Sequence, residues 1–468
     1  MSEAYDFVVI GAGSAGYAAA SAASARGLKT VIIEGGAVVG GLCILRGCMP
    51  SKSILETSHR AETVRRAAEF GIDAEFRGVD AEAIHARKCR LIEEFAGYRR
   101  TQLETGKFDF IRGMARFKDP HTLEVDLLHG GGSTTITGRA FLVAAGSHMH
   151  HVPVEGLEET GYVTSDEVLE STRLPKSVII LGGGAIALEF ATYYAGLGIP
   201  TSLIQRGAQV LKETDGDIAE AVTEGLRAHG VEIFCNTSLT TVRRVGDLKQ
   251  VCFDHAGRLH SVEAEEIVYA LGRRPNTDRL QLDRAQVELT RAGAIAANFA
   301  QQSSQSHIFA AGDVCGPYEV VHIAIQQGEI AARNAARLLA GKGEALEQID
   351  YGSKLFAVFS QPEVASLGIT EREAAAQECD FMVSRYPFAD HGKSLVMGEC
   401  HGFVKLIVER ATRRIVGAAV VGPHASELIH EIAVAMHFRA TAGDLAKVPH
   451  YHPTLGEIWT YPAEELAG

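Results

Sequence analysis

Residues 5–34, YDFVVIGAGSAGYAAASAASARGLKTVIIE, decide the fold of the amino-terminal part of the chain. The pattern predicts a β-branched strand, a glycine turn, an alanine-rich helix and a second strand that closes on Glu34. Gly11, Gly13 and Gly16 fit G-x-G-x-x-G, and Glu34 follows Gly11 by 23 residues (34 minus 11). Strand, helix and terminal acid at this spacing indicate a dinucleotide site. The glycines let a pyrophosphate reach the helix N-terminus, and the acid binds ribose hydroxyls.

A second copy of this pattern follows at residues 177–206, SVIILGGGAIALEFATYYAGLGIPTSLIQR. Its three glycine positions are occupied by Gly182, Gly184 and Ala187. The position 23 residues after Gly182 is Gln205 (182 plus 23) rather than an acid, and Arg206 and Lys212 come soon after it. Basic groups at this point suit a 2′-phosphate, so the second site favours NADP(H) over NAD(H), with NAD(H) kept open. The alternative is that Arg206 faces solvent, as most arginines do.

Composition limits the class of protein. The chain has 468 residues, which predicts about three domains, and its net charge of −13 argues against nucleic acid or anionic membrane as a main partner. Eight cysteines, with no signal peptide before the apolar run FVVIGAG, do not resemble a secreted disulfide framework, so we expect a cytoplasmic location. Residues 177–199 are apolar enough to imitate a membrane span, but their glycine cluster and the central Glu189 argue against one.

A pair of cysteines lies in residues 40–52, GGLCILRGCMPSK. On an ideal helix, five residues rise about 7.5 Å, more than the roughly 6.8 Å of Cα separation that a disulfide tolerates. A bond between Cys43 and Cys48 therefore requires a locally tightened backbone, and such a bond suits redox cycling better than stapling. Pro50 is suited to the first turn of a helix, which would put Cys48 near a positive helix end where a thiolate is favoured. The alternative is two unrelated buried thiols. The glycines that permit the tightening are Gly40, Gly41 and Gly47.

Two dinucleotide sites and a cycling cysteine pair imply that electrons pass from a nicotinamide through a flavin to sulfur. The sequence resembles the class I pyridine nucleotide-disulfide oxidoreductases, the group of dihydrolipoamide dehydrogenase, glutathione reductase and mercuric reductase. The resemblance covers nearly the whole chain. It rests on GGLCILRGCMPSK, the paired glycine motifs, HIFAAGDV at 307–314 and HYHPTLGE at 450–457. It implies a homodimeric FAD enzyme.

The resemblance also implies roles for residues around the flavin. Cys48 resembles the thiol that lies against the flavin, and Cys43 resembles the interchange thiol that attacks substrate. Lys52 is similar to the lysine at flavin N5, which the family pairs with the glutamate matching Glu189. Asp313 resembles the aspartate that holds the flavin ribitol. The alternatives are a buried helix acid for Glu189, which would itself need a partner, and a turn aspartate for Asp313.

Further cofactor contacts follow from the same resemblance. The run VVHIAIQQGE at 320–329 is expected to point a helix N-terminus at the pyrimidine end of the flavin, where charge accumulates on reduction. His322 lies at this end and would act through its backbone more than its ring. Gly146 and Gly272 complete the expected cofactor-binding set.

His452 is the remaining candidate for acid–base catalysis. A disulfide reductase must protonate a leaving thiolate, and imidazole titrates near working pH. The resemblance implies that this histidine comes from the other subunit and is held by Glu457. The alternative is that Thr454 and Glu457 form a T-x-x-E capping box at a helix start.

Departures from the family pattern limit the choice of substrate. Arg46, between the cysteines, could lower a thiolate pKa, receive an acidic substrate or be solvated, and these alternatives stay open. Mercuric reductase is disfavoured because no cysteine follows Cys400 and because His452 replaces its tyrosine. The histidine cluster SHMHHVP at 147–153 carries no cysteine or acid, so we expect it to be exposed and expect no metal.

We therefore predict an α/β chain with two Rossmann-like dinucleotide-binding domains and a carboxy-terminal α+β dimerisation domain. The predicted function is transfer of electrons from NAD(P)H through FAD and Cys43–Cys48 to a small disulfide or dithiol, with dihydrolipoamide dehydrogenase as the nearest type. The alternatives are an NADPH-dependent glutathione reductase-like enzyme, a flavin diaphorase or transhydrogenase, and a flavin-bearing interaction protein. The predicted boundaries are 1–150 and 276–347 for FAD binding, 151–275 for NAD(P) binding and 348–468 for dimerisation.

Overall fold

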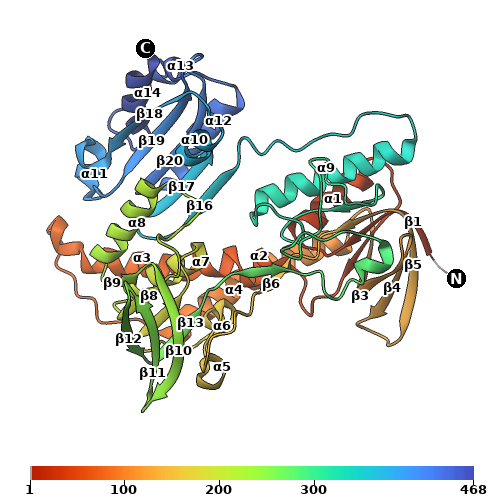
Figure 1. The fold of residues 1–468 in the computed structure, drawn as a ribbon, viewed down its shortest axis with the longest axis horizontal. Helices are drawn as coiled ribbons and strands as arrows, with labels where there is room; N and C mark the ends of the chain where they lie inside the picture. The colour runs from red at the N-terminus through yellow and green to blue at the C-terminus, as the bar shows by residue number, and fades with distance from the viewer. Residues whose placement is uncertain (1–2) are drawn as a thin grey trace. The chain divides into compact units, whose positions relative to one another are not determined.

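The computed structural model describes residues 3–468 and divides into two compact units, whose helices and strands are labelled in Figure 1. The first unit holds the chain up to Ser51, then Ala86–His151 and Gly272–Asp350. The second unit holds Lys52–His85, Val152–Leu271 and Tyr351–Gly468.

A mainly parallel sheet organises the first unit. Its parallel strands run in the order β3 (Asp109–Asp119), β2 (Thr30–Glu34), β1 (Glu3–Ile10), β5 (Ser133–Val143) and β15 (Ile308–Ala310). Strand β4 (Thr122–Leu127) pairs antiparallel with β3 and β5, and β4 and β5 form a hairpin across the glycines at residues 130–132. Buried and exposed side chains do not alternate along β1, because Phe7 to Ile10 are all buried. This is expected for a parallel sheet that is covered on both faces.

Helices α1 (Ser14–Ser24) and α9 (Val321–Ala340) pack closely against each other in the first unit, as Figure 1 shows. The buried residues that the two helices contribute to their shared core cluster are alanines, and a Cβ on Gly328 would lie 2.3 Å from the carbonyl oxygen of Ala15. The small side chains therefore let the backbones of α1 and α9 approach each other closely. The N-termini of both helices lie in the first unit.

The second unit contains a four-stranded parallel sheet in the order β13 (Glu266–Tyr269), β7 (Val178–Leu181), β8 (Thr201–Ile204) and β9 (Val231–Phe234). Helices α7 (Ala185–Gly196) and α8 (Gly216–Ala228) join its strands. A separate antiparallel sheet consists of β10 (Thr237–Val245), β11 (Leu248–His255) and β12 (Arg258–Ala264). The apolar stretch 177–199 is thus a buried strand and helix. Among the described residues no helix has the length and hydropathy to cross a membrane.

The carboxy-terminal part of the second unit is an antiparallel sheet covered by helices. The strand order is β16 (Leu355–Val358), β17 (Glu363–Gly368), β20 (Ile415–Gly422), β19 (Phe403–Glu409) and β18 (Phe381–Pro387). Helix α12 (Ala425–His437) packs on β17 and β20, and α14 (Thr460–Ala467) packs on β18 and β19. The fully buried Trp459 joins the two helices, since its indole Nε1 donates to the carbonyl oxygen of Leu428 at 3.1 Å.

The remaining elements are short connections and two long helices, α3 and α4. They are α2 (Gly41–Arg46), α3 (Cys48–Arg65), η1 (Ala67–Phe70), α4 (Ala81–Glu104), β6 (Ser147–Met149), α5 (Leu157–Thr160), α6 (Ser165–Glu170), β14 (Arg273–Pro275), η2 (Leu282–Ala285), α10 (Glu371–Ala376), η3 (Phe388–Asp390), α11 (Gly392–Met397), α13 (Ala442–Ala446) and η4 (Gly456–Trp459).

A buried ion network ties the carboxy-terminal sheet to the start of α8. Lys405 is fully buried on β19, and its Nζ lies 2.7 Å from Asp215, 2.9 Å from Asp217 and 2.8 Å from Glu371. Burial acts to lower the pKa of Lys405, but its hydrogen bonds to the three carboxylates raise it overall. The predicted fold class is confirmed: two parallel sheets of dinucleotide-binding type are followed by an α+β part.

Candidate active site

The first glycine motif forms a tight turn between β1 and α1. Gly11 has φ +104°, and a Cβ there would lie 2.3 Å from the carbonyl oxygen of Ala144. A Cβ on Gly16 would lie 1.9 Å from the Gly11 carbonyl oxygen, whereas one on Gly13 would meet nothing within 4 Å. The two outer glycines are therefore required by packing, and the middle one leaves open space at the helix N-terminus.

That helix end can receive an anion. Gly13 is the N-cap of α1, no side chain caps the helix, and its first turn contains no acidic residue. The first backbone N–H groups and the helix dipole therefore meet the open space beside Gly13. At the end of β2, Glu34 accepts hydrogen bonds from the backbone N–H of Ala12 at 2.8 Å and of Gly36 at 2.6 Å. These bonds fix its carboxylate next to the turn.

The cysteine segment packs against this turn. Cys43 lies in α2, Cys48 is the first residue of α3, and both are half-buried. Gly41 has φ +73°, and a Cβ there would lie 2.7 Å from the Cα of Gly13. The helix breaks at Gly47, where a Cβ would lie 3.3 Å from the Cα of Cys43. The backbone between the cysteines is thus folded tightly on itself, as a bond between them would require, and Cys48 is in a first helical turn.

Asp313 is held beside β6. The hydroxyl of Ser147 donates to Asp313 Oδ2 at 2.6 Å, and Arg273 Nε donates to the same hydroxyl oxygen at 2.8 Å. The backbone of Gly146 takes part nearby, since its carbonyl oxygen accepts from the N–H of Asn276 at 2.9 Å. The carboxylate therefore has a fixed orientation.

The turn between β15 and α9 is fixed by a buried glutamine that the sequence reasoning did not single out. Gln327 is fully buried, accepts from the N–H of Gly312 at 2.7 Å and donates to the carbonyl oxygen of Gly316 at 2.8 Å. His322 is exposed in the first turn of α9, a helix that has no side-chain cap and no acid in that turn. Gly272 has φ +111°, and its carbonyl oxygen accepts from the N–H of His150 at 3.0 Å.

These features of the first unit fit FAD. An open glycine turn at one helix N-terminus suits its pyrophosphate, and the anchored Glu34 suits its adenosine ribose. The oriented Asp313 and the uncapped start of α9 offer an acceptor and a positive dipole end for the flavin half.

The second glycine motif repeats this geometry in the second unit. Gly182 has φ +124°, and a Cβ there would lie 2.3 Å from the carbonyl oxygen of Ala270. Gly184 meets open space at the uncapped N-terminus of α7, and Ala187 is fully buried. Gln205 follows β8, where its Nε2 donates to the carbonyl oxygen of Gln209 at 3.3 Å.

The basic residues after β8 are on the surface. Arg206 is exposed and makes no ion pair or hydrogen bond with any other described residue. Lys212 is also exposed and lies 3.4 Å from Glu213, a pair so open to solvent that it contributes little to stability. Both positive charges are therefore exposed in the segment that follows β8.

Lys52 and Glu189 meet although they are far apart in the sequence. Lys52 Nζ lies 2.7 Å from Oε1 and 2.9 Å from Oε2 of Glu189, whose side chain is 9% exposed. Lys52 also lies 4.6 Å from the ring centroid of Phe359, and the backbone N–H of Phe359 donates to Glu189 at 3.3 Å. Glu189 is therefore both a buried helix acid and the partner of Lys52, so the two interpretations of this residue are compatible.

His452 and Glu457 form a second such pair. His452 Nδ1 lies 3.0 Å from Glu457 Oε2, and the imidazole is 80% exposed whereas the carboxylate is mostly buried. The capping-box alternative is wrong: η4 starts at Gly456 with Leu455 as its N-cap, and the Glu457 side chain turns to His452 instead of the backbone of Thr454.

A third residue lies behind this pair. His391 is fully buried, its Nε2 is 3.4 Å from Glu457 Oε1, and its Nδ1 is 2.9 Å from the hydroxyl of Ser394. Burial lowers the pKa of His391, and the neighbouring His452 acts in the same direction, against the opposite effect of Glu457. The burial of this imidazole therefore favours its neutral form. No motif in the sequence links His391 to the HYHPTLGE segment.

Comparison with known proteins identifies the family. The family model for pyridine nucleotide-disulphide oxidoreductases matches residues 5–328, and that for their dimerisation domain matches residues 356–463. The chain belongs to the pyridine nucleotide-disulphide oxidoreductase family.

Several relatives match this chain over nearly its whole length. A protein named dihydrolipoyl dehydrogenase from Geobacillus stearothermophilus is 32% identical, with 98% of this chain and 96% of the relative covered. Dihydrolipoyl dehydrogenase 3 from Haloarcula marismortui is 34% identical, with 97% and 94% covered. Among solved structures, the Cu(II) complex of the HOCl-induced flavoprotein disulfide reductase RclA from Escherichia coli has a TM-score of 0.85 and 25% identity, covering 99% of this chain and all of that one.

The family membership confirms the predicted class of enzyme. The chain is an FAD-dependent oxidoreductase that acts on sulfur groups, is dihydrolipoamide dehydrogenase-like in sequence and uses a pyridine nucleotide. Its dimerisation domain supports formation of a homodimer.

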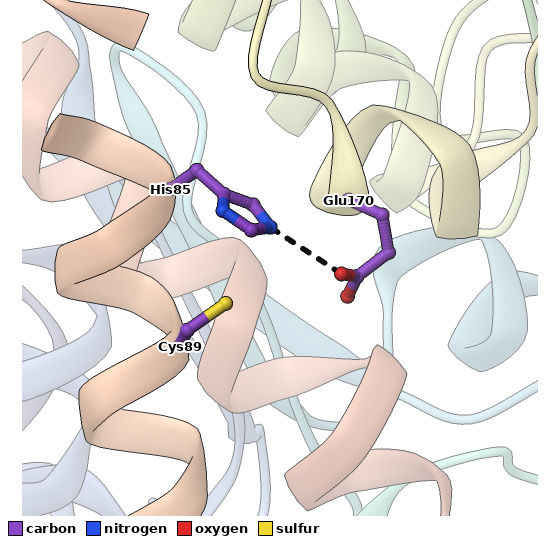
Figure 2. Close-up of side chains that lie close together, drawn as sticks. All are labelled: His85, Cys89 and Glu170. Atoms are coloured by element: carbon purple, nitrogen blue, oxygen red, sulfur yellow. Dashed lines mark hydrogen bonds and ion pairs between the residues drawn. The ribbon is translucent and has the colours of Figure 1, made fainter. Parts of the chain in front are cut away.

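The structure also contains a polar cluster that the family resemblance does not explain. Figure 2 shows the imidazole of His85, on α4, directed at the carboxylate of Glu170, the last residue of α6; His85 Nε2 and Glu170 Oε2 are 3.4 Å apart. Cys89 follows His85 by four residues and therefore lies on the same face of α4. None of the three belongs to the groups described above.

Proposed function

We propose that this oxidoreductase exchanges electrons between a pyridine nucleotide and a lipoyl-type dithiol, as dihydrolipoamide dehydrogenases do. The single observation behind the proposal is the 32–34% identity to relatives of that name over at least 97% of the chain. In the reductive direction, NAD(P)H, a proton and a disulfide become NAD(P)⁺ and two thiols. In the oxidative direction, the same atoms and electrons move in reverse.

The cysteine segment is the proposed carrier of electrons. Bound FAD supplies the chemistry that connects a two-electron nicotinamide to a disulfide. Cys43 attacks the substrate disulfide, and Cys48 then displaces the substrate from Cys43 by forming an S–S bond with it. The tight backbone at Gly47 and the position of Cys48 in the first turn of α3 support this assignment, because a helix N-terminus favours the thiolate.

His452 is the proposed acid and base. Glu457 accepts a hydrogen bond from the Nδ1–H group of His452. The other ring nitrogen, Nε2, is then the atom that gives a proton to the leaving thiolate and takes one from an attacking thiol. The imidazole is exposed, as expected of a residue that acts on groups outside its own domain.

We further propose that each active site is shared between two subunits. His452 is more than 400 residues from Cys43 in the sequence. The carboxy-terminal domain that carries it exposes large apolar side chains, with Phe438 76% and Tyr451 82% exposed. Exposed apolar groups of this size are expected where a second subunit covers them. The other members of the set are Leu395, Val396, Val434 and Val448.

NADP(H) is the proposed nucleotide. Gln205 stands where an acid would bind the 2′-hydroxyl of NAD(H), and the exposed Arg206 offers its charge to a 2′-phosphate. This observation also favours the second candidate, a glutathione reductase-like enzyme. Arg206→Glu should raise the KM for NADPH about tenfold or more and leave that for NADH nearly unchanged. Equal effects on the two nucleotides would remove the 2′-phosphate assignment.

A matrix of steady-state rates tests the proposal. Lipoamide, glutathione disulfide and other small disulfides are each assayed with NADH and NADPH. We expect lipoamide to give the highest kcat/KM; a higher value for glutathione disulfide would select the second candidate. Cys43→Ser should abolish disulfide reduction but keep nicotinamide-driven bleaching of the flavin. The matched control Cys379→Ser, at an exposed cysteine outside the proposed site, should behave as the wild type.

The predicted domain boundaries, the cytoplasmic location and the individual roles of the cofactor-binding glycines remain predictions. Limited proteolysis tests the boundaries most simply, because cleavage is expected in the exposed residues 341–345 before the dimerisation domain.

A further inference from the structure

An arginine on α4 stacks on an aromatic ring of α1 and forms no ion pair with any residue of 3–468. Arg99 is half-buried, and its guanidinium carbon lies 4.1 Å from the ring centroid of Tyr17. Tyr17 is fixed in turn: its N–H donates to the Gly13 carbonyl oxygen at 3.0 Å, and its ring makes an edge contact with Phe108 at 6.4 Å. The guanidinium therefore stacks on a rigid aromatic face.

No described residue neutralises this arginine. Its Nη1 is buried and has no hydrogen-bond acceptor in the described chain, and none of the ion pairs of residues 3–468 includes it. The next residue, Arg100, differs because it lies 3.6 Å from Glu93. Burial lowers the pKa of Arg99, and only tyrosines and Cys43 supply charge that would raise it. A cation removed from water without a counter-ion is costly, so an external anion is expected at such a position.

Two observations connect Arg99 to Cys43. Cys43 lies close enough to Arg99 that a thiolate there would raise the pKa of the guanidinium. The backbone also links them: α2, which carries Cys43, begins at Gly41 against Gly13, one turn before the Tyr17 ring on which Arg99 stacks. The positive charge is therefore on the side of α1 that faces the cysteine segment, within the same unit.

We propose that Arg99 is a specificity-determining residue that binds an anionic group, a carboxylate in particular, on the disulfide that Cys43 attacks. A guanidinium presents paired N–H donors that match a carboxylate, and stacking on Tyr17 holds it in one orientation before the substrate arrives. The inference rests on the proposed role of Cys43 as the thiol that attacks substrate.

Lipoate and lipoamide provide the test, because they differ only in a carboxylate against a neutral amide. In Arg99→Gln, kcat/KM for lipoate should fall about ten- to a hundredfold relative to the wild type, while that for lipoamide should change less than about threefold. Arg99→Lys should recover part of the lipoate activity because it keeps the charge. Arg100→Gln, which removes a paired arginine from the next position of the same helix, should leave both values unchanged.

A second substrate pair makes the result independent of lipoyl recognition. The dianionic 5,5′-dithiobis(2-nitrobenzoate) should lose rate in Arg99→Gln, and the uncharged 4,4′-dithiodipyridine should not. Equal losses for charged and neutral substrates, or loss of bound FAD from the variant, would overturn the role of Arg99. Failure of the wild type to reduce lipoamide while it reduces the aromatic pair would count against the proposed function alone.

Discussion

The ion pair of Lys52 and Glu189 gives the prediction that can be worked furthest from the structure. The ammonium lies within 2.9 Å of both carboxylate oxygens, and the two side chains are 30% and 9% exposed. Breaking a fully buried pair costs about 3–5 kcal/mol, and an exposed pair contributes about 0–1 kcal/mol. Because this pair is intermediate in exposure, we expect a coupling free energy of about 2 kcal/mol.

The coupling can be measured with a double-mutant cycle of Lys52→Met and Glu189→Gln. The chain contains one tryptophan, Trp459, which is buried in the same unit, so its fluorescence during urea unfolding reports on this unit. Arg60 and Glu56 provide a matched control on the same helix, since they lie 2.6 Å apart but are 78% and 43% exposed. If the coupling of the Lys52 pair is no larger than that of the control, the structural reasoning is wrong.

Three further predictions concern single positions. His229→Gln should cost about 1 kcal/mol near pH 6, measured by urea unfolding, and almost nothing near pH 9. The 2.8 Å bond to Glu62 raises the pKa of His229, so its contribution is fully present below the pKa of an unfolded histidine and disappears as pH rises through the folded value; a pH-independent loss would contradict this. Cys315 should resist iodoacetamide at pH 8 in the folded protein, because burial raises its pKa to about 12; rapid modification seen by peptide mass spectrometry would exclude such a shift. Gly41→Ala should lower the FAD content, read from flavin absorbance, because the added Cβ would meet the glycine turn; Gly130→Ala, also at a positive φ but with open space around it, should keep its FAD, and equal losses would argue against the contact.

Short sequence motifs predicted those turns of the protein whose backbone conformation depends on neighbouring residues only. Gly11 and Gly182 could be placed from sequence because a strand–turn–helix step needs a glycine at that point whatever surrounds it. The tight turn at Gly47 lies in the segment where a bond between Cys43 and Cys48 was predicted to require a tightened backbone. These features span fewer than about forty residues of chain each, the size of one βαβ unit.

Contacts between distant segments were predicted only through the family resemblance or were missed. Lys52 and Glu189 are separated by 137 residues, so their pairing depends on how α3 and α7 pack and leaves no periodic signal. His391 and Arg99 were not anticipated for the same reason. A buried histidine that precedes a short helix, and an arginine on α4 that pairs with none of the described residues, are distinguished by their surroundings, which the residue order does not encode locally.

The central claim is that Cys43 and Cys48 form a reversible disulfide in electronic contact with the flavin. An anaerobic titration of the oxidised enzyme with dithionite, followed by flavin absorbance, tests it most directly. We predict that full reduction consumes about four electrons per flavin, two for the flavin and two for the cysteine pair, and that Cys48→Ser requires about two. A wild-type requirement of about two electrons would contradict the account.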